Sequence, residues 1–191
     1  DAQRALGGLD VLVNNAGIAG PTAKVEEMHP EDWDRCVNIC LTGQFNCTRL
    51  AVPLLRLSTN ASIVNISSAA GRLGFAMRTP YAAAKWGVIG FTKSLSIELG
   101  PDNIRVNLVA PGYFDTGRVY QRVRAMMSEK GISQADAEAQ VSGGLPAGRI
   151  GSPEELAELV AFVASRKSGF MTGATITIDG GGGRARRAGA V

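Results

Sequence analysis

Residues 68–90 read SAAGRLGFAMRTPYAAAKWGVIG and connect an apolar run, 62–66, to a helical pattern that ends at Leu99. The run is short and apolar, as expected of a buried strand, and Pro80 stands where a helix would begin, a position that proline favours. The residues between them, 71–79, are predicted to form a loop. A strand followed directly by a helix is the repeating unit of an α/β fold with a parallel sheet.

The same stretch carries three residues suited to carbonyl chemistry. Tyr81 and Lys85 are four positions apart, so on a helix they share a face. Free tyrosine has a pKa of about 10, and a nearby ammonium lowers it toward the range where proton transfer is efficient. A Tyr–Lys pair with this spacing also occurs on many surface helices. Ser68, at the carboxyl end of the preceding strand, makes a proton-donor site the favoured interpretation.

The chain resembles the short-chain dehydrogenase/reductase family, of the 3-oxoacyl-[acyl-carrier-protein] reductase type. The matching stretches follow the family's order across almost the whole chain. They are LDVLVNNAG (9–17), Asn38 in RCVNICLTGQF, SIVNISSAAG (62–71), YAAAK (81–85), IRVNLVAPGYFDT (104–116), GRIGSPEEL (148–156) and TGATITIDGG (172–181).

The resemblance implies a catalytic set of Asn38, Ser68, Tyr81 and Lys85. Ser68 would hydrogen-bond the substrate oxygen, and Tyr81 would give or take the proton. Lys85 would lower the pKa of Tyr81 and bind the nicotinamide ribose. Asn38, at a local break in its helix, would hold a water molecule that contacts the lysine. By itself, an asparagine inside a helix is usually a solvated polar residue.

The implied cofactor is NAD or NADP, and no metal is expected. Small and polar residues follow the first strand, at the end of a parallel strand where ligands bind in open α/β sheets, although a tight turn would use the same residues. The implied cofactor-binding residues are Asn15, Ala16, Gly17, Tyr81, Lys85, Pro111, Gly112, Phe114 and Thr116. The family usually has Ile or Val where this chain has Phe114.

The rest of the chain continues the α/β pattern. Further strands are predicted at 9–13, 104–109 and 174–178, and a helix at 152–165. A long helix is predicted over 30–57, with Gly43 as a weak point. Residues 113–145 are helical but less regular, with a break at SEKGIS, and could form a mobile lid. The chain reads as one domain, 1–182, followed by a flexible basic tail, 183–191.

The predicted fold class is α/β: a Rossmann-like doubly wound parallel sheet, truncated at its N-terminus. The family's strand order is 3-2-1-4-5-6-7, and this chain would hold strands 4 to 7. No glycine-rich turn precedes the first strand. The four glycines at 180–183 follow the last strand without a helix, so they are not a dinucleotide fingerprint. The strand at 9–13 would then be a bare apolar edge.

Composition favours a cytoplasmic protein without a nucleic-acid or membrane partner. The net charge is only +3, much of it in RARR (184–187), and no apolar run approaches the roughly 20 residues that cross a bilayer. Cys36, Cys40 and Cys47 lie on one predicted helix face and are expected to be buried free thiols.

The expected function is interconversion of a small-molecule carbonyl and a secondary alcohol by NAD(P)-dependent hydride transfer. A homo-oligomer, a dimer or tetramer, is expected from the resemblance, through the long helix and the helix of Tyr81. The alternative is a catalytically idle module that only associates with related chains.

Overall fold

The computed structural model of the chain describes residues 2–183, and 184–191 of the predicted tail lie outside them. A four-stranded parallel sheet forms its centre, with the strands in the order β1-β2-β3-β4. Strands 4 to 7 of the family's sheet are also neighbours in sequence order. The observed order therefore confirms the predicted fold class. The strands are β1 (Val11–Asn14), β2 (Ser62–Ile66), β3 (Arg105–Pro111) and β4 (Thr175–Ile178).

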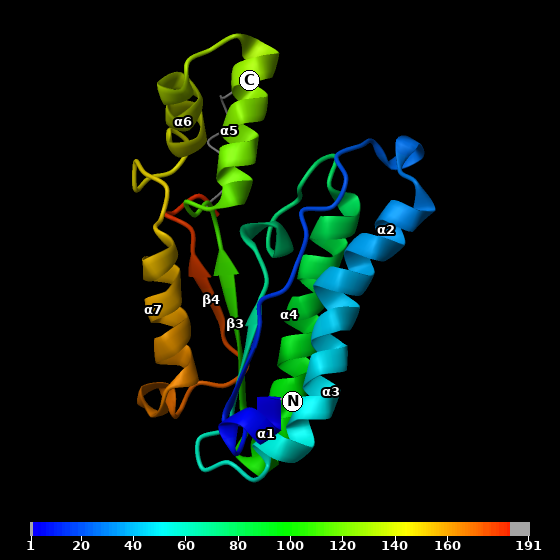
Figure 1. Cartoon of the computed structure of the whole chain (residues 1–191), viewed down its shortest axis with the longest axis vertical. Helices are drawn as coiled ribbons and strands as arrows, with labels where there is room; N and C mark the ends of the chain where they lie inside the picture. The colour runs from blue at the N-terminus through cyan, green and yellow to red at the C-terminus, as the bar shows by residue number, and fades with distance from the viewer. Residues whose placement is uncertain (1, 184–191) are drawn as a thin grey trace.

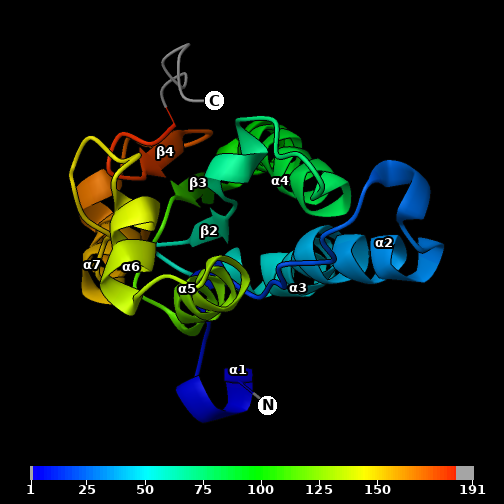
Figure 2. The same ribbon diagram turned by 90° about the horizontal axis from the view of Figure 1, so that it is seen from above.

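Helices cover both faces of the sheet. Figures 1 and 2 show α3 (Gly43–Leu55) and α4 (Thr79–Leu99) on one face and α7 (Pro153–Ala164) on the other. All five residues of β2 are buried, as expected of a parallel strand covered on both sides. Its side chains alternate between two cores, with Ile63 packing toward α3 and α4 and Val64 packing toward α7.

Two further helices, α5 (Gly117–Lys130) and α6 (Gln134–Ser142), lie beyond the carboxyl ends of β3 and β4 (Figure 1). They share a small core of their own, formed by Val119, Val123, Ala137 and Val141. The predicted break between them is confirmed: Gly131 ends α5 in the left-handed conformation, with φ of 63°. Glycine adopts this conformation without a steric cost.

The long helix predicted at 30–57 is interrupted. The structure has α2 (Pro30–Val37), a π-helical segment (Asn38–Thr42) and then α3. The amide of Gly43 donates to the Asn38 carbonyl, five residues back, so the predicted weak point closes the wide turn. The extra residue in that turn changes which side chains face inward along α3.

This shift corrects the prediction for the cysteines. Cys36 and Cys40 are buried, but Cys47 is exposed, and Thr48 occupies the inward position instead. An unbroken α-helix repeats every 3.6 residues and would have placed positions 36, 40 and 47 on one face. The π turn moves the buried positions of α3 forward by one residue.

The remaining elements are short. They are α1 (Ala2–Leu6) and single helical turns at Val25–Glu27, Ala69–Gly71, Gly100–Asp102 and Arg166–Ser168. β1 is an edge strand in the described sheet, as predicted. Its Val13 is 42% exposed. Within residues 2–183, no helix is long and apolar enough to cross a membrane.

Candidate active site

Loops from the carboxyl ends of β1, β2 and β3 meet the start of α4. The chain leaves β1 through 15–18, leaves β2 through 67–71, and leaves β3 through 112–116. Because the strands are parallel, these exits lie at the same edge of the sheet. This is the edge where ligands bind in open α/β sheets.

Tyr81 and Lys85 lie on the first turns of α4, and both are buried, with exposures of 8% and 3%. The Lys85 ammonium nitrogen Nζ donates a hydrogen bond to the Ile66 carbonyl at 2.9 Å and lies 5.8 Å from the centroid of the Tyr81 ring. A buried ammonium needs such partners, because removal of a charge from water is costly. The predicted pairing of Tyr81 with Lys85 on one helix face is therefore present.

The loop that carries Ser68 packs directly on the helix turn that carries Lys85. Ser67 Oγ donates to the Lys85 carbonyl at 2.8 Å, and Ser68 Oγ accepts a hydrogen bond from the Ala70 amide at 3.2 Å. A side-chain carbon at Gly71 would lie 2.7 Å from the Lys85 carbonyl oxygen, so only glycine permits this approach. Ser68 itself is half-buried.

Gly17 brings the exit of β1 onto Lys85. A side-chain carbon at Gly17 would lie 3.5 Å from Lys85 Nζ and 3.6 Å from Cys40 Sγ. The Cys40 thiol also holds Ile18, donating to its carbonyl and accepting from its amide, each at 3.4 Å. Asn15 and Ala16, which precede Gly17, are exposed. Gly17, Cys40 and Lys85 are thus neighbours.

Asn38 lies at the start of the π-helical turn. Its side chain is exposed, whereas Cys36 and Cys40 on either side are fully buried. Two positions along a helix correspond to a rotation of about 200°, so residues two apart cannot both face inward. Cys40 is the buried residue of this segment, and the role that the resemblance assigns to Asn38 stays a prediction.

The implied cofactor residues after β3 lie along one continuous segment. Gly112 passes so close to Asp179 that a side-chain carbon would lie 2.7 Å from the Asp179 Cα. The Phe114 ring is buried against Gly151, and Thr116 is exposed as the residue before the first turn of α5. Pro111 ends β3 and is half-buried. This segment follows β3 at the edge of the sheet where the loops after β1 and β2 also lie.

A chain of buried amides and hydroxyls links the two helices across the sheet, and sequence analysis did not assign it. Asn14 donates to Thr48 Oγ1 at 3.1 Å and to Asn65 Oδ1 at 2.8 Å, and Asn65 donates to Thr92 Oγ1 at 2.9 Å. Asparagines inside otherwise apolar strands were the available signal, because a buried amide requires partners. The chain fixes β1 against β2 and both against the helices.

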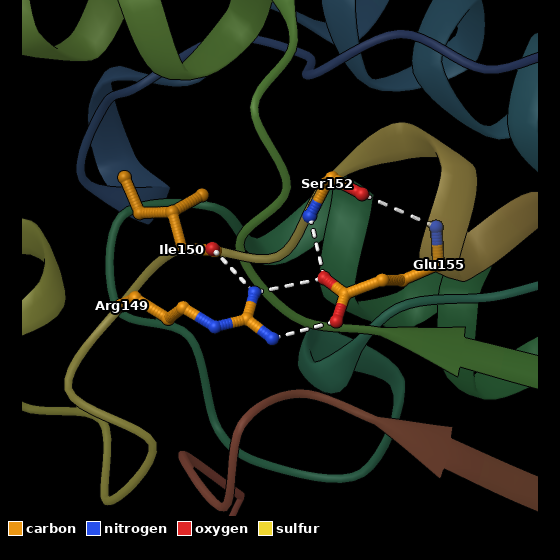
Figure 3. A network of polar contacts seen from close by, with 4 residues as sticks. All are labelled: Arg149, Ile150, Ser152 and Glu155. Atoms are coloured by element: carbon orange, nitrogen blue, oxygen red, sulfur yellow. Dashed lines mark hydrogen bonds and ion pairs between the residues drawn. The ribbon is translucent and has the colours of Figure 1, made fainter.

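At the other end of the site, α7 begins with an exposed ionic network (Figure 3). Arg149 forms two hydrogen bonds to the Glu155 carboxylate, at 2.8 and 2.6 Å, and Ser152 and Glu155 form a reciprocal capping box. The Arg149 guanidinium, and then the Ser152 amide, lower the pKa of Glu155 to about 2. The network closes one side of a cavity of about 220 Å³ that Phe114 also lines.

The Cys36 thiol is kept protonated by its environment. Burial, and then the adjoining Cys40, raise the pKa of Cys36 to about 11, whereas a free thiol titrates near 8.5. Cys36 therefore stays protonated at neutral pH. Within the described part of the chain, no group of three or more His, Cys, Asp or Glu side chains is arranged to hold a metal ion.

A family model described as "Enoyl-(Acyl carrier protein) reductase" matches residues 1–182. Among curated relatives, 3-oxoacyl-[acyl-carrier-protein] reductase FabG of Thermotoga maritima is 46% identical over 175 residues. That match covers 92% of this chain and 66% of the relative. The chain thus spans slightly less than two thirds of that relative's length.

Two solved structures have the same fold. The ligand-free aldohexose dehydrogenase of Thermoplasma acidophilum superposes with a TM-score of 0.89 at 33% identity, covering 99% of this chain and 73% of that one. ElxO with NADP bound superposes with a TM-score of 0.82 at 31% identity, covering 95% of this chain and 70% of that one.

Proposed function

Because the chain belongs to the short-chain dehydrogenase/reductase family, we propose that it contributes the catalytic part of an NAD(P)-dependent oxidoreductase. The reaction interconverts a carbonyl and a secondary alcohol. The observation that supports it most is the buried Lys85 ammonium, held by the Ile66 carbonyl beside the Tyr81 ring. A structural lysine is seldom buried, and this one faces the residue suited to proton transfer.

In the direction of reduction, Tyr81 donates its phenolic proton to the carbonyl oxygen as the carbon accepts a hydride. The Lys85 ammonium stabilises the resulting phenolate, and Ser68 donates a hydrogen bond to the oxygen on which charge develops. In the direction of oxidation, the phenolate removes the alcohol proton. Both steps need a site that keeps Lys85 charged, and the Ile66 carbonyl serves this purpose.

The nicotinamide cofactor, when bound, supplies or accepts the hydride. Two segments would hold it. One is Asn15, Ala16 and Gly17, where Gly17 lies against Lys85, and the other is Pro111, Gly112, Phe114 and Thr116 after β3. Tyr81 and Lys85 would contact the ribose between them. ElxO, a structural neighbour, has NADP bound, which supports NAD or NADP here.

The helices α5 and α6 form the substrate lid in this proposal. They hold a core separate from the sheet. Their base is fixed where the Asp115 amide donates to the Gly151 carbonyl at 2.8 Å and the Gly151 amide donates to the Tyr113 carbonyl at 3.0 Å. Such a unit can move over the site while its base stays fixed. The substrate is a small molecule with a carbonyl or secondary alcohol.

We also propose that the protein forms a homo-oligomer, a dimer or tetramer, in the cytoplasm. Large apolar side chains are exposed on both helices, among them Phe45 and Leu50 on α3 and Trp86 and Ile97 on α4. Exposed apolar side chains that form a contiguous patch usually mark an association surface. The three cysteines are free thiols, which suits a reducing compartment.

The proposal is tested by incubating the purified chain with NADH or NADPH and a panel of ketones and 3-oxoacyl thioesters, and following nicotinamide absorbance. Turnover that disappears in Tyr81→Phe supports it. A chain that associates with related proteins, yet neither binds cofactor nor turns over, would instead support the idle interaction module.

A further inference from the structure

Arg78 is a half-buried arginine at the position before α4, three residues ahead of Tyr81. Its Nη1 donates to the Ala19 carbonyl at 2.9 Å and to the Gly20 carbonyl at 3.0 Å. Its Cζ lies 6.0 Å from the centroid of the Phe75 ring. Among the described residues, no carboxylate forms an ion pair with it. The guanidinium therefore holds backbone, and hydrogen bonds from a charged donor are stronger than neutral ones.

The loop after β1 and the loop before α4 also meet through their backbones. The Ala23 amide donates to the Met77 carbonyl at 3.1 Å. Met77 has a φ of 61°, in the left-handed region that residues other than glycine seldom adopt. Such a conformation persists where the surrounding contacts enforce it, and it is found most often at functional sites. Arg78 and Met77, which are adjacent in the chain, thus join the two loops.

The part of the β1 exit that Arg78 holds lies against Tyr81 and Lys85. A side-chain carbon at Gly20 would lie 3.9 Å from Tyr81 Cβ, and one at Gly17 would lie 3.5 Å from Lys85 Nζ. Gly20 has a φ of 69°, which glycine adopts without a steric cost. The position of this segment relative to α4 therefore depends on what holds residues 17–20.

Two groups hold this segment beyond the end of β1. Cys40 Sγ exchanges hydrogen bonds with the Ile18 backbone, each at 3.4 Å, but a thiol is a weak donor and a weak acceptor. Arg78 holds the next two residues, Ala19 and Gly20, with a charged donor. Removal of Arg78 would leave the weaker contact to hold the segment.

We propose that Arg78 is a positioning residue. It holds the chain after β1 against α4, so that the cofactor segment 15–17 keeps a fixed place relative to Tyr81. This inference rests on the proposed function, because the place of that segment matters for hydride transfer only if it contacts the nicotinamide. The sequence did not indicate this role, because an arginine in a loop is usually solvated.

The main variant is Arg78→Met, which removes the guanidinium and keeps much of the side chain. Arg78→Lys keeps the charge but not the planar fork of donors, so it should restore the contact in part. The matched control is Arg166→Met. Arg166 is exposed and donates to Thr59 Oγ1 at 3.0 Å, before the amino end of β2. The control therefore removes a hydrogen-bonded guanidinium far from the segment.

Hydrogen exchange followed by mass spectrometry tests the contact without turnover. The Ile18 and Ala23 amides are hydrogen-bonded, so peptides over 18–24 contain amides whose exchange reports release of the loop. In Arg78→Met their exchange should become about tenfold faster or more, while peptides of β2 and β3 keep the parent rate. Arg166→Met should not change peptides over 18–24. Unchanged exchange there in Arg78→Met would overturn the proposal.

Steady-state kinetics test the consequence for the cofactor. Arg78→Met should raise the KM for NADH or NADPH by about fivefold or more, and Arg78→Lys should recover part of this loss. A variant that is only less stable has fewer active molecules, which lowers the apparent kcat and leaves KM unchanged. Arg166→Met should keep the parent KM. A KM within about twofold of the parent in Arg78→Met would contradict the proposal.

The two measurements separate this inference from the proposed function. A parent chain that neither binds NAD(P)H nor turns over would count against the proposed function alone, and the exchange of 18–24 would then decide whether Arg78 holds the segment. If Arg78→Met fails to fold, Arg78→Gln replaces it, because its shorter, uncharged amide is a weaker donor. Parent values of both exchange and KM in a folded Arg78→Gln would contradict the proposal.

Discussion

The two ends of the candidate site hold their charged side chains in different environments. At the β2–α4 end, the Lys85 ammonium and the side-chain amide of Gln44 are buried, and both donate to the Ile66 carbonyl. At the start of α7, the Arg149–Glu155 pair is exposed, and its side chains retain 62% and 42% of their accessible surface. Buried polar groups lose much when one partner is removed, whereas exposed ion pairs contribute little to stability. Substitutions at the buried end should therefore affect activity, and substitutions at the exposed end should affect only local stability.

The largest effect is expected at the buried end, from Tyr81→Phe. The variant keeps the ring and its packing but removes the proton that the carbonyl oxygen needs. Positioned acid–base groups contribute about 10²- to 10⁴-fold to rate, so turnover of a ketone should fall by at least about a hundredfold, as read from nicotinamide absorbance. A thermal melt of Tyr81→Phe that matches the parent is the control for an intact fold. Activity within about tenfold of the parent in Tyr81→Phe would refute the assignment.

Lys85→Met should lower the rate of alcohol oxidation strongly at neutral pH and less at high pH. The variant keeps the length of the side chain but removes the ammonium, so hydroxide must replace its help in forming the Tyr81 phenolate. A pH–rate profile between neutral and strongly alkaline pH measures the change. Lys93→Met, on the exposed face of the same helix, should leave the profile unaltered. A profile of unchanged shape in Lys85→Met would contradict the role of the ammonium.

The close packing of the 67–71 loop on α4 can be tested through stability. Gly71→Ala places a carbon 2.7 Å from the Lys85 carbonyl oxygen, whereas Gly74→Ala, three residues further along, meets nothing within 4 Å. Overpacking costs about 1–3 kcal/mol, so Gly71→Ala should lower the thermal midpoint by several degrees and Gly74→Ala should not. Differential scanning calorimetry measures both. Equal melting of the two variants would show that the loop moves aside freely.

The sequence predicted the elements that depend on local pattern. The strand at 62–66 and the helix that carries Tyr81 end where they were expected to end, because each is a strong apolar pattern between loop residues. The π turn at Asn38–Thr42 was not predicted. Hydrophobic periodicity does not show whether a backbone amide in a helix donates to the carbonyl four or five residues back. That single turn explains one wrong expectation, a buried Cys47.

The site was predictable where residue chemistry is distinctive. Tyr81 and Lys85 could be paired from their spacing, and the structure shows them together. Gln44 could not be recognised, because a glutamine in a helical pattern looks like a solvated residue until the fold shows that its face is buried. The roles of Ser68 and of the cofactor-binding residues stay predictions.

The smallest effect is expected at the exposed end, from Arg149→Gln. The guanidinium holds the pKa of Glu155 near 2, below the value of about 4.3 for an unfolded chain. A depressed carboxylate pKa stabilises the fold above the unfolded value, and this contribution is lost as the pH falls from about 4 toward 2. In the variant the pKa of Glu155 rises, so less stability remains to be lost in that interval.

Urea unfolding at pH 6 and at pH 3 measures this difference, with Arg49→Gln, an exposed arginine on α3, as a control for the lost charge. At pH 6 we expect the urea midpoint of Arg149→Gln to lie close to that of the parent, because the pair is exposed and screened. Between the two pH values it should lose less stability than the parent and the control. If all three lose the same amount, the Ser152 amide of the capping box, rather than Arg149, keeps the Glu155 carboxylate ionised.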